Sequence, residues 1–132
     1  MTDTDKKIKI LVVEDDKLLR DILAMKLAKP NLEIIHALDG EQALKLVAEA
    51  KPNVVLLDII LPGINGFEVL EKMKSEAETK DIHVIIISNL GQEEDIKKAQ
   101  QLGAADFIIK ANATADEISE KLMEFIEAHH IA

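Results

Sequence analysis

Several side chains that could do chemistry stand directly after short apolar segments of the chain. They are Glu14, Asp15 and Asp16 after the first segment, Asp58 after the third, Ser88 and Asn89 after the fourth, and Lys110 after the fifth. If these segments are parallel strands of one open sheet, ligands bind outside their carboxyl ends. The second segment ends in His36 and Ala37 and brings no comparable group. The pattern therefore predicts one site built from carboxylates, a hydroxyl and an amine.

The carboxylates of Glu14, Asp15 and Asp58 would crowd negative charge at this site. Like charges at close range raise one another's pKa values and destabilise the fold. A hard divalent cation with oxygen ligands relieves the repulsion, and Mg²⁺ does so through one or two carboxylates while keeping several waters. Such an ion also lowers the electrostatic barrier to an incoming phosphoryl group. We therefore expect Mg²⁺ as the cofactor.

Asp58 is the candidate nucleophile of the site. A carboxylate can attack phosphorus and form an acyl phosphate, in a reaction that needs mainly positioning and charge neutralisation. Lys110 could balance the phosphoryl charge, and Ser88 could donate a hydrogen bond to it. Asp16 is interpreted as the cap of the following helix, because Asp is preferred at that position.

The elements that must position these residues alternate along the chain. Several of the predicted strands are continuous in Ile, Val and Leu, as expected where both faces of a parallel sheet are covered. Helical apolar spacing separates them. Five such units predict an open parallel α/β sheet with helices on both faces, of flavodoxin-like strand order 2-1-3-4-5. The predicted strands are 8–13, 32–37, 53–57, 82–87 and 105–109.

The approximate first and last residues of two helices can be predicted. One is predicted from Gly66 to about Glu76, and the next from about Gln92 to Leu102 with Gly103 at its C-terminal cap. The second of these carries few apolar residues: Ile96, Ala99 and Leu102. A helix held by so few apolar contacts opens easily.

Length and composition limit the classes of protein. The 132 residues predict one domain over 1–132, with residues 1–7 frayed. The absence of cysteine excludes disulfides and thiolate sites. We expect a cytoplasmic protein, since no apolar run reaches the length of a membrane span and the N-terminus lacks a signal peptide. The formal charge of −9 argues against binding to nucleic acid.

The matching segments of the chain together identify a family resemblance. They are 10–16, 54–58, 61–66, 85–88 and 103–110. From about Lys9 to Glu127 the chain resembles a response-regulator receiver domain of the single-domain, chemotaxis-regulator kind. The resemblance implies a phosphoprotein switch of a two-component system or phosphorelay. It also implies that Asp58 receives a phosphoryl group from the phosphohistidine of a sensor kinase or phosphotransfer protein.

The resemblance further implies roles for individual residues. Glu14 and Asp15 hold Mg²⁺, with Asp58 and the backbone carbonyl of Ile60 as further ligands.

Other implied roles concern signalling. Ser88 and Lys110 sense the phosphoryl group, and Phe107 turns inward on phosphorylation. Residues 92–128 form the output face, which would contact an unidentified output protein or a second copy of the chain.

Four positions depart from the family's commonest pattern. Ala111 replaces the proline that usually follows the lysine in a cis bond. Because a non-proline cis bond costs roughly 3 kcal/mol, we predict a trans bond after Lys110. Asn89 is larger than usual and could narrow access to the site or hydrogen-bond to the phosphoryl group. Ile60 and Leu90 occupy the two positions that tune dephosphorylation, and their apolar side chains cannot position a water. We predict slow autodephosphorylation and no enzymatic turnover beyond it.

Three alternatives remain open. A flavin-binding electron carrier would need a phosphate-binding loop where Glu14, Asp15 and Asp16 stand. A haloacid-dehalogenase-like phosphatase would need a second acid where Ile60 stands. A degenerate receiver that binds partners without phosphorylation stays possible because of Asn89 and Ala111.

The chain also contains four histidines: His36, His83, His129 and His130. Their spacing does not match a metal site with a carboxylate partner. The sequence therefore predicts a metal only at the acidic strand ends.

Overall fold

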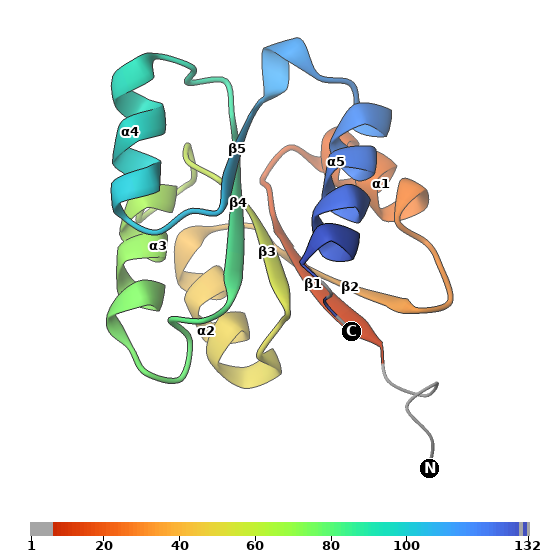
Figure 1. Ribbon diagram of the computed structural model, residues 1–132, viewed down its shortest axis with the longest axis horizontal. Helices are drawn as coiled ribbons and strands as arrows, with labels where there is room; N and C mark the ends of the chain where they lie inside the picture. Colours follow the sequence, from red (N-terminus) through yellow and green to blue (C-terminus); the bar gives the residue numbers. More distant parts are fainter. Residues whose placement is uncertain (1–6, 130, 132) are drawn as a thin grey trace.

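A five-stranded parallel sheet forms the centre of the protein (Figure 1). The computed structural model describes residues 7–129 and 131, so the predicted fraying of 1–6 lies outside it, and Lys7 is exposed. The predicted strand order is confirmed as β2-β1-β3-β4-β5. The strands are β1 (Ile8–Val13), β2 (Leu32–Ala37), β3 (Val54–Asp58), β4 (His83–Ser88) and β5 (Asp106–Ile109).

Two of the strands end one residue later than predicted. Asp58 is the last residue of β3 and Ser88 the last residue of β4. The sheet register explains the difference, because Asp58 is aligned with Ile87 and Ser88 with Ile109 of the neighbouring strand. Both side chains therefore start from paired, rigid backbone instead of from loops.

The helices lie on both faces of the sheet, as predicted. Helices α1 and α5 cover one face, and α2, α3 and α4 cover the other (Figure 1). They are α1 (Lys17–Lys26), α2 (Gly40–Ala50), α3 (Gly66–Ser75), α4 (Glu93–Gln101) and α5 (Ala115–Ala128). No helix in the described part of the chain is both long enough and apolar enough to cross a bilayer.

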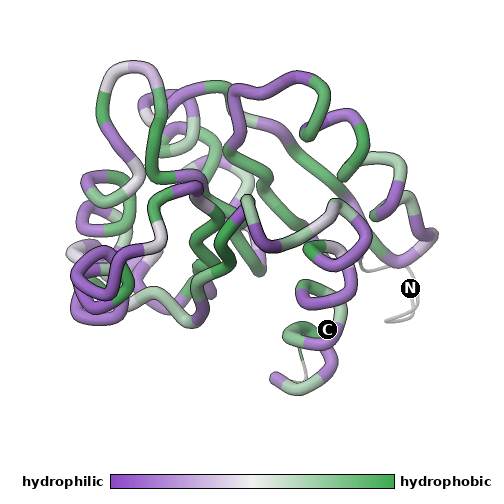
Figure 2. The backbone as a smooth tube through the Cα atoms, turned by 90° about the horizontal axis from the view of Figure 1, so that it is seen from above, coloured by the Kyte–Doolittle hydropathy of each residue, from purple (hydrophilic) through white to green (hydrophobic). Residues whose placement is uncertain are grey.

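Two apolar layers result from the alternation of side chains along the strands. On β1, Ile10 and Val12 pack toward α1 and α5, whereas Leu11 and Val13 pack toward the other helices. All four are fully buried. Burial on both faces is the physical reason why the inner strands β1, β3 and β4 are nearly continuous apolar runs. Figure 2 shows the apolar stretches gathered at the centre and the hydrophilic stretches around them.

Helix α4 is held to the sheet by few apolar contacts. Ala99 is the one buried residue among its nine. The ammonium of Lys98 lies 4.5 Å from the ring centre of Phe67 on α3 and adds a cation–π contact. Gly103 follows the helix with a φ of +101°, a conformation that favours glycine. The narrow apolar stripe predicted from the sequence is confirmed.

Candidate functional site

The carboxyl ends of β1, β3, β4 and β5 bring the predicted polar residues together. Glu14 follows β1 and is completely buried, Asp58 ends β3 and is 4% exposed, and Ser88 ends β4 and is completely buried. Asp15 is exposed at the rim. Glu14, Asp15 and Asp58 each offer an oxygen, and these oxygens all lie within 4.8 Å of one another. The crowding of carboxylates predicted from the sequence is therefore present.

Lys110 enters this cluster from the end of β5. It begins a short 3₁₀ helix, Lys110–Asn112, and its Nζ donates a 2.7 Å hydrogen bond to Asp58 Oδ2. The same atom lies 2.5 Å from Glu14 Oε1. The bond between Lys110 and Ala111 is trans, as predicted. The ammonium therefore bridges two carboxylates without the usual cis proline after it.

Backbone amides support the reactive side chains. Asp58 Oδ1 accepts a hydrogen bond of 3.2 Å from the Ile60 amide. Ser88 Oγ accepts one of 3.0 Å from the Leu90 amide, which leaves its hydroxyl proton free to be donated elsewhere. Both contacts fix the direction of a side chain that the sequence placed at the site.

The loop after β1 is organised around Glu14. Asp16 caps α1 by accepting hydrogen bonds from the amides of Leu18 and Leu19, as predicted. Its own amide donates to Glu14 Oε2 at 3.1 Å. Arg20 donates to the backbone oxygen of Glu14 at 3.0 Å, a contact that no sequence pattern indicated.

Gly66 is a second residue whose importance sequence reasoning missed. In the sequence it stands at the predicted start of a helix and at the end of the matching segment 61–66, and neither position indicates a steric role. A Cβ at this position would lie 2.3 Å from the backbone oxygen of Asp58. The Gly66 amide also donates to the backbone oxygen of Ile59 at 2.8 Å. Glycine therefore lets α3 begin directly against the strand end that carries Asp58.

Burial and charge shift the pKa values of two groups in the cluster. Burial is the main cause that raises the pKa of Glu14, and the charge of Asp58 adds to it, while Lys110 and the Asp16 amide oppose it. Burial alone would lower the pKa of Lys110, but the neighbouring carboxylates of Asp58 and Glu14 raise it overall. Lys110 is therefore a cation at neutral pH.

The donor set of the cluster fits Mg²⁺. Glu14 Oε1 is buried and accepts no directed hydrogen bond, since its contact with Lys110 has the distance of an ion pair but not the geometry of a hydrogen bond. The cluster holds three carboxylates, the Lys110 ammonium contacts two of them, and every candidate ligand is an oxygen. Mg²⁺ prefers such ligands.

The remaining predicted residues lie around the site. Phe107 is half-buried on β5, in the apolar layer that faces α4. Ile60 is 59% exposed and Leu90 is 36% exposed, and Asn89 is exposed beside them. Their roles in switching and dephosphorylation stay predictions.

Known proteins resemble this chain in sequence and structure. The chain is 36% identical over 104 residues to a probable transcriptional regulator, ycf27 of Cyanophora paradoxa, covering 79% of this chain but 42% of that protein. The response regulator domain of Thermotoga maritima CheB is 30% identical with a TM-score of 0.81, over 93% of this chain and 96% of that one. The phosphorylated cyanobacterial phytochrome response regulator RcpA is 28% identical with a TM-score of 0.81, over 92% of both chains.

A family model of the response regulator receiver domain matches residues 10–123. The match spans all the strands except the first two residues of β1, and it includes the acidic cluster and Lys110. The chain therefore belongs to the family of response regulator receiver domains, the phosphoryl-accepting switches of two-component systems.

Proposed function

We propose that Asp58 accepts a phosphoryl group from the phosphohistidine of a sensor kinase or a phosphotransfer protein. The observation that carries the proposal is the position of Asp58 at the end of β3, almost fully buried, with Oδ2 bonded at 2.7 Å to the Lys110 ammonium. RcpA, a relative of similar fold, is known in phosphorylated form.

The residues present can perform the transfer. One oxygen of Asp58 forms the new bond to phosphorus as the bond from phosphorus to the donor's imidazole nitrogen breaks, and the imidazole keeps the electron pair. Lys110 offsets the negative charge of the phosphoryl oxygens, and the Ser88 hydroxyl donates a hydrogen bond to one of them. Mg²⁺ held by the carboxylates of Glu14, Asp15 and Asp58 would supply further charge neutralisation.

The protein would act as a switch and not as a turnover enzyme. Phosphorylation changes the surface of residues 92–128, which then binds an output protein or a second copy of the chain. Support comes from helix α4, which has a single buried residue and therefore shifts at low energetic cost. The acidic composition disfavours nucleic acid as the direct partner.

The test is intact mass after incubation with Mg²⁺ and acetyl phosphate, for the wild type and Asp58→Ala. One phosphoryl adduct is expected in the wild type alone, and hydroxylamine should remove it because it cleaves acyl phosphates. An adduct that persists in Asp58→Ala would refute Asp58 as the acceptor. An absence of adduct in both proteins would favour a receiver that depends on its kinase or a module that binds partners without phosphorylation. Mg²⁺ titration would then separate these two.

A further inference from the structure

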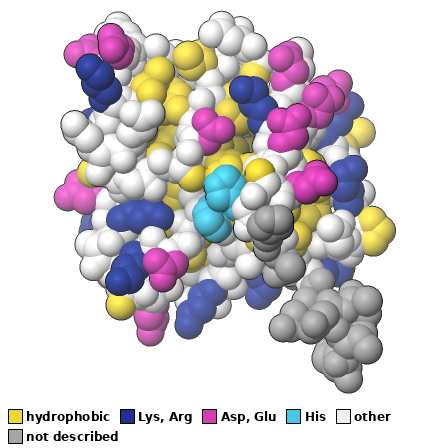
Figure 3. Space-filling view, in the orientation of Figure 1, with side chains coloured by type: hydrophobic (Ala, Val, Ile, Leu, Met, Phe, Trp, Pro, Cys, Tyr) yellow, Lys and Arg dark blue, Asp and Glu magenta, His cyan; other side chains and the backbone are white. Residues whose placement is uncertain are grey.

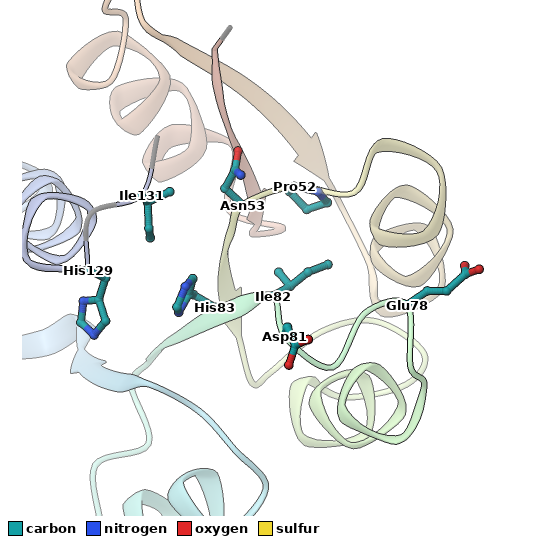
Figure 4. Close-up of a pocket in the computed structure, with 8 residues that line it drawn as sticks. All are labelled: Pro52, Asn53, Glu78, Asp81, Ile82, His83, His129 and Ile131. Carbon is teal, nitrogen blue, oxygen red and sulfur yellow. The ribbon is translucent and has the colours of Figure 1, made fainter. Parts of the chain in front are cut away.

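A pocket with two histidines lies at the end of the sheet opposite Asp58. It has a volume of about 380 Å³ and lies where β3 and β4 begin and α5 ends. Figure 4 shows His83 and His129 side by side in it, with Asn53 and Asp81 nearby. This pocket plays no part in the proposed phosphoryl transfer.

The fold brings together two imidazoles that are far apart in the sequence. His83 is the first residue of β4 and His129 follows α5, yet their ring centres are 5.6 Å apart. Figure 3 shows histidine side chains as one patch on this face, with acidic side chains close by. The spacing of histidines along the chain did not indicate this pair, because only the docking of α5 against β4 creates it.

Neighbouring groups hold both rings in place. The Phe125 ring stacks on His129 with centres 3.9 Å apart and meets His83 edge-on at 5.4 Å. Nδ1 of His129 lies 3.0 Å from the Phe125 backbone oxygen. Since a carbonyl can only accept, Nδ1 carries a proton, and in the neutral ring Nε2 is then the nitrogen that has the lone pair. An imidazole oriented by a backbone carbonyl in this way is typical of metal ligands.

The separation of the rings suits a shared ion. A Zn²⁺ ion binds imidazole nitrogen at about 2.0–2.1 Å, which places the ion roughly 3.2 Å from the ring centre. Two imidazoles on one ion then have ring centres about 5 to 6 Å apart, for angles that are tetrahedral or wider. The observed 5.6 Å lies in this range.

Charged groups of both signs lie around the pocket. Burial, and then the proximity of His129 and Lys74, lower the pKa of His83, so its ring is neutral at physiological pH. Glu78 and Asp81 line the pocket. The nearby Lys74 ammonium is bound to the backbone oxygens of residues 80 and 82.

We infer that this pocket binds one divalent first-row transition-metal ion through the imidazoles of His83 and His129. Within residues 7–129 and 131, no third His, Cys, Asp or Glu joins the pair in a three-residue cluster. Nitrogen ligands separate this site from the all-oxygen cluster at Asp58, and they favour Cu²⁺ over the other divalent ions of the series. The ion would tie the end of α5 to the start of β4.

The test is calorimetric titration of Zn²⁺ into the untagged full chain, with Mg²⁺ in excess to occupy the acidic cluster. One site is expected in the wild type and in His36→Asn, whose altered residue lies on β2. His83→Asn and His129→Asn should each weaken binding about tenfold or more. No binding by the wild type, or equal binding by all four proteins, would overturn the inference.

A second measurement covers the case in which a variant fails to fold. In wild-type protein labelled with ¹⁵N, Zn²⁺ should shift the imidazole signals of His83 and His129 and leave those of His36 unchanged. Shifts confined to His36 or to His130 would overturn the inference, as would binding that is lost in His130→Asn and kept in His83→Asn.

Discussion

Lys110 Nζ donates a 2.7 Å hydrogen bond to Asp58 Oδ2, although 52 positions of sequence separate the two residues. The same ammonium lies against Glu14, so one cation serves two buried carboxylates. A phosphoryl group on Asp58 would compete for this ammonium. The contact is therefore the point at which phosphorylation should first disturb the resting structure.

Replacing Lys110 by Met should slow phosphorylation by acetyl phosphate. The variant loses the positive charge that faces the phosphoryl oxygens, and loss of one such donor costs a factor of about 100 or more. The measurement is the rate of adduct formation by intact mass.

The matched control is Lys97→Met, which removes an exposed ammonium on α4 that pairs with Glu93. It should phosphorylate at the wild-type rate. An unchanged rate in Lys110→Met would show that the ammonium does not act on the incoming group.

Replacing Asp15 by Asn should weaken Mg²⁺ binding about tenfold or more, because the cluster loses one anionic oxygen. The measurement is the Mg²⁺ concentration that gives half of the increase in thermal stability. Glu14 and Asp58 remain in place in this variant, so the acidic cluster is reduced and not removed.

Asp16→Asn is the control, because it removes the same negative charge one position further along the chain. Asn caps helices about as well as Asp, so α1 keeps its cap. The Asp16 side chain binds the amides of α1 and is not in the acidic cluster. If Asp15→Asn and Asp16→Asn weaken Mg²⁺ binding equally, the effect comes from the loss of negative charge near the site and not from the loss of a ligand.

The phosphorylated form should be long-lived, with a half-life far longer than seconds. Ile60 and Leu90 are exposed and apolar, each stands two residues after a site residue, and neither offers a group that could hold an attacking water. Ile60→Asn should shorten the half-life about tenfold, because its amide can orient a water. Decay of the adduct after removal of acetyl phosphate measures this.

Leu18→Asn replaces another exposed apolar residue, 70% exposed on α1, and should leave the decay unchanged. A wild-type half-life of seconds at neutral pH would contradict the prediction, whatever the variants do.

Replacing Lys98 by Ala should loosen α4. The cation–π contact with Phe67 is one of few that hold this helix, and such contacts contribute about 0.5–1 kcal/mol at exposed sites. Hydrogen exchange of the α4 amides should become faster by the factor to which this loss of free energy corresponds.

Lys97→Ala on the same helix is the control, since its ammonium forms only an exposed ion pair. Equal acceleration in both variants would indicate a loss of helix propensity or charge and not of the contact with Phe67.

The stability of the metal-free protein should fall below about pH 6.5 in part through His83. Burial lowers its pKa in the folded state, so the unfolded chain takes up the proton more readily. The contribution of neutral His83 to the free energy of unfolding is therefore complete at pH values above its pKa in the unfolded chain. It is lost as the pH falls through its pKa in the folded protein. Urea unfolding of His83→Asn between pH 5 and 7.5 should show a flatter profile.

His36 offers a comparison, because burial and then Arg20 lower its pKa as well. His36→Asn should flatten the profile separately, and the two effects should add, since the residues lie on different strands. If the free energy of unfolding of His83→Asn depends on pH as it does in the wild type, the contribution assigned to His83 is wrong.

The sequence was sufficient to predict the order of the strands and helices. It was also sufficient to predict which residues form the acidic site. Burial on both faces makes a parallel strand a continuous apolar run, so the strands were visible without a structure. Parallel strands end at one edge, so Glu14, Asp58 and Ser88 could be placed together from their positions alone. The cap formed by Asp16 is a local contact and was equally predictable.

Only the tertiary structure decided which distant groups touch. The bridge from Lys110 to Glu14 and Asp58, and the absence of room for a Cβ at Gly66, depend on how strand ends approach one another. The pairing of His83 with His129 depends on how α5 docks against β4. Local sequence patterns determine periodicity and caps, whereas contacts between elements are set by packing of the whole core.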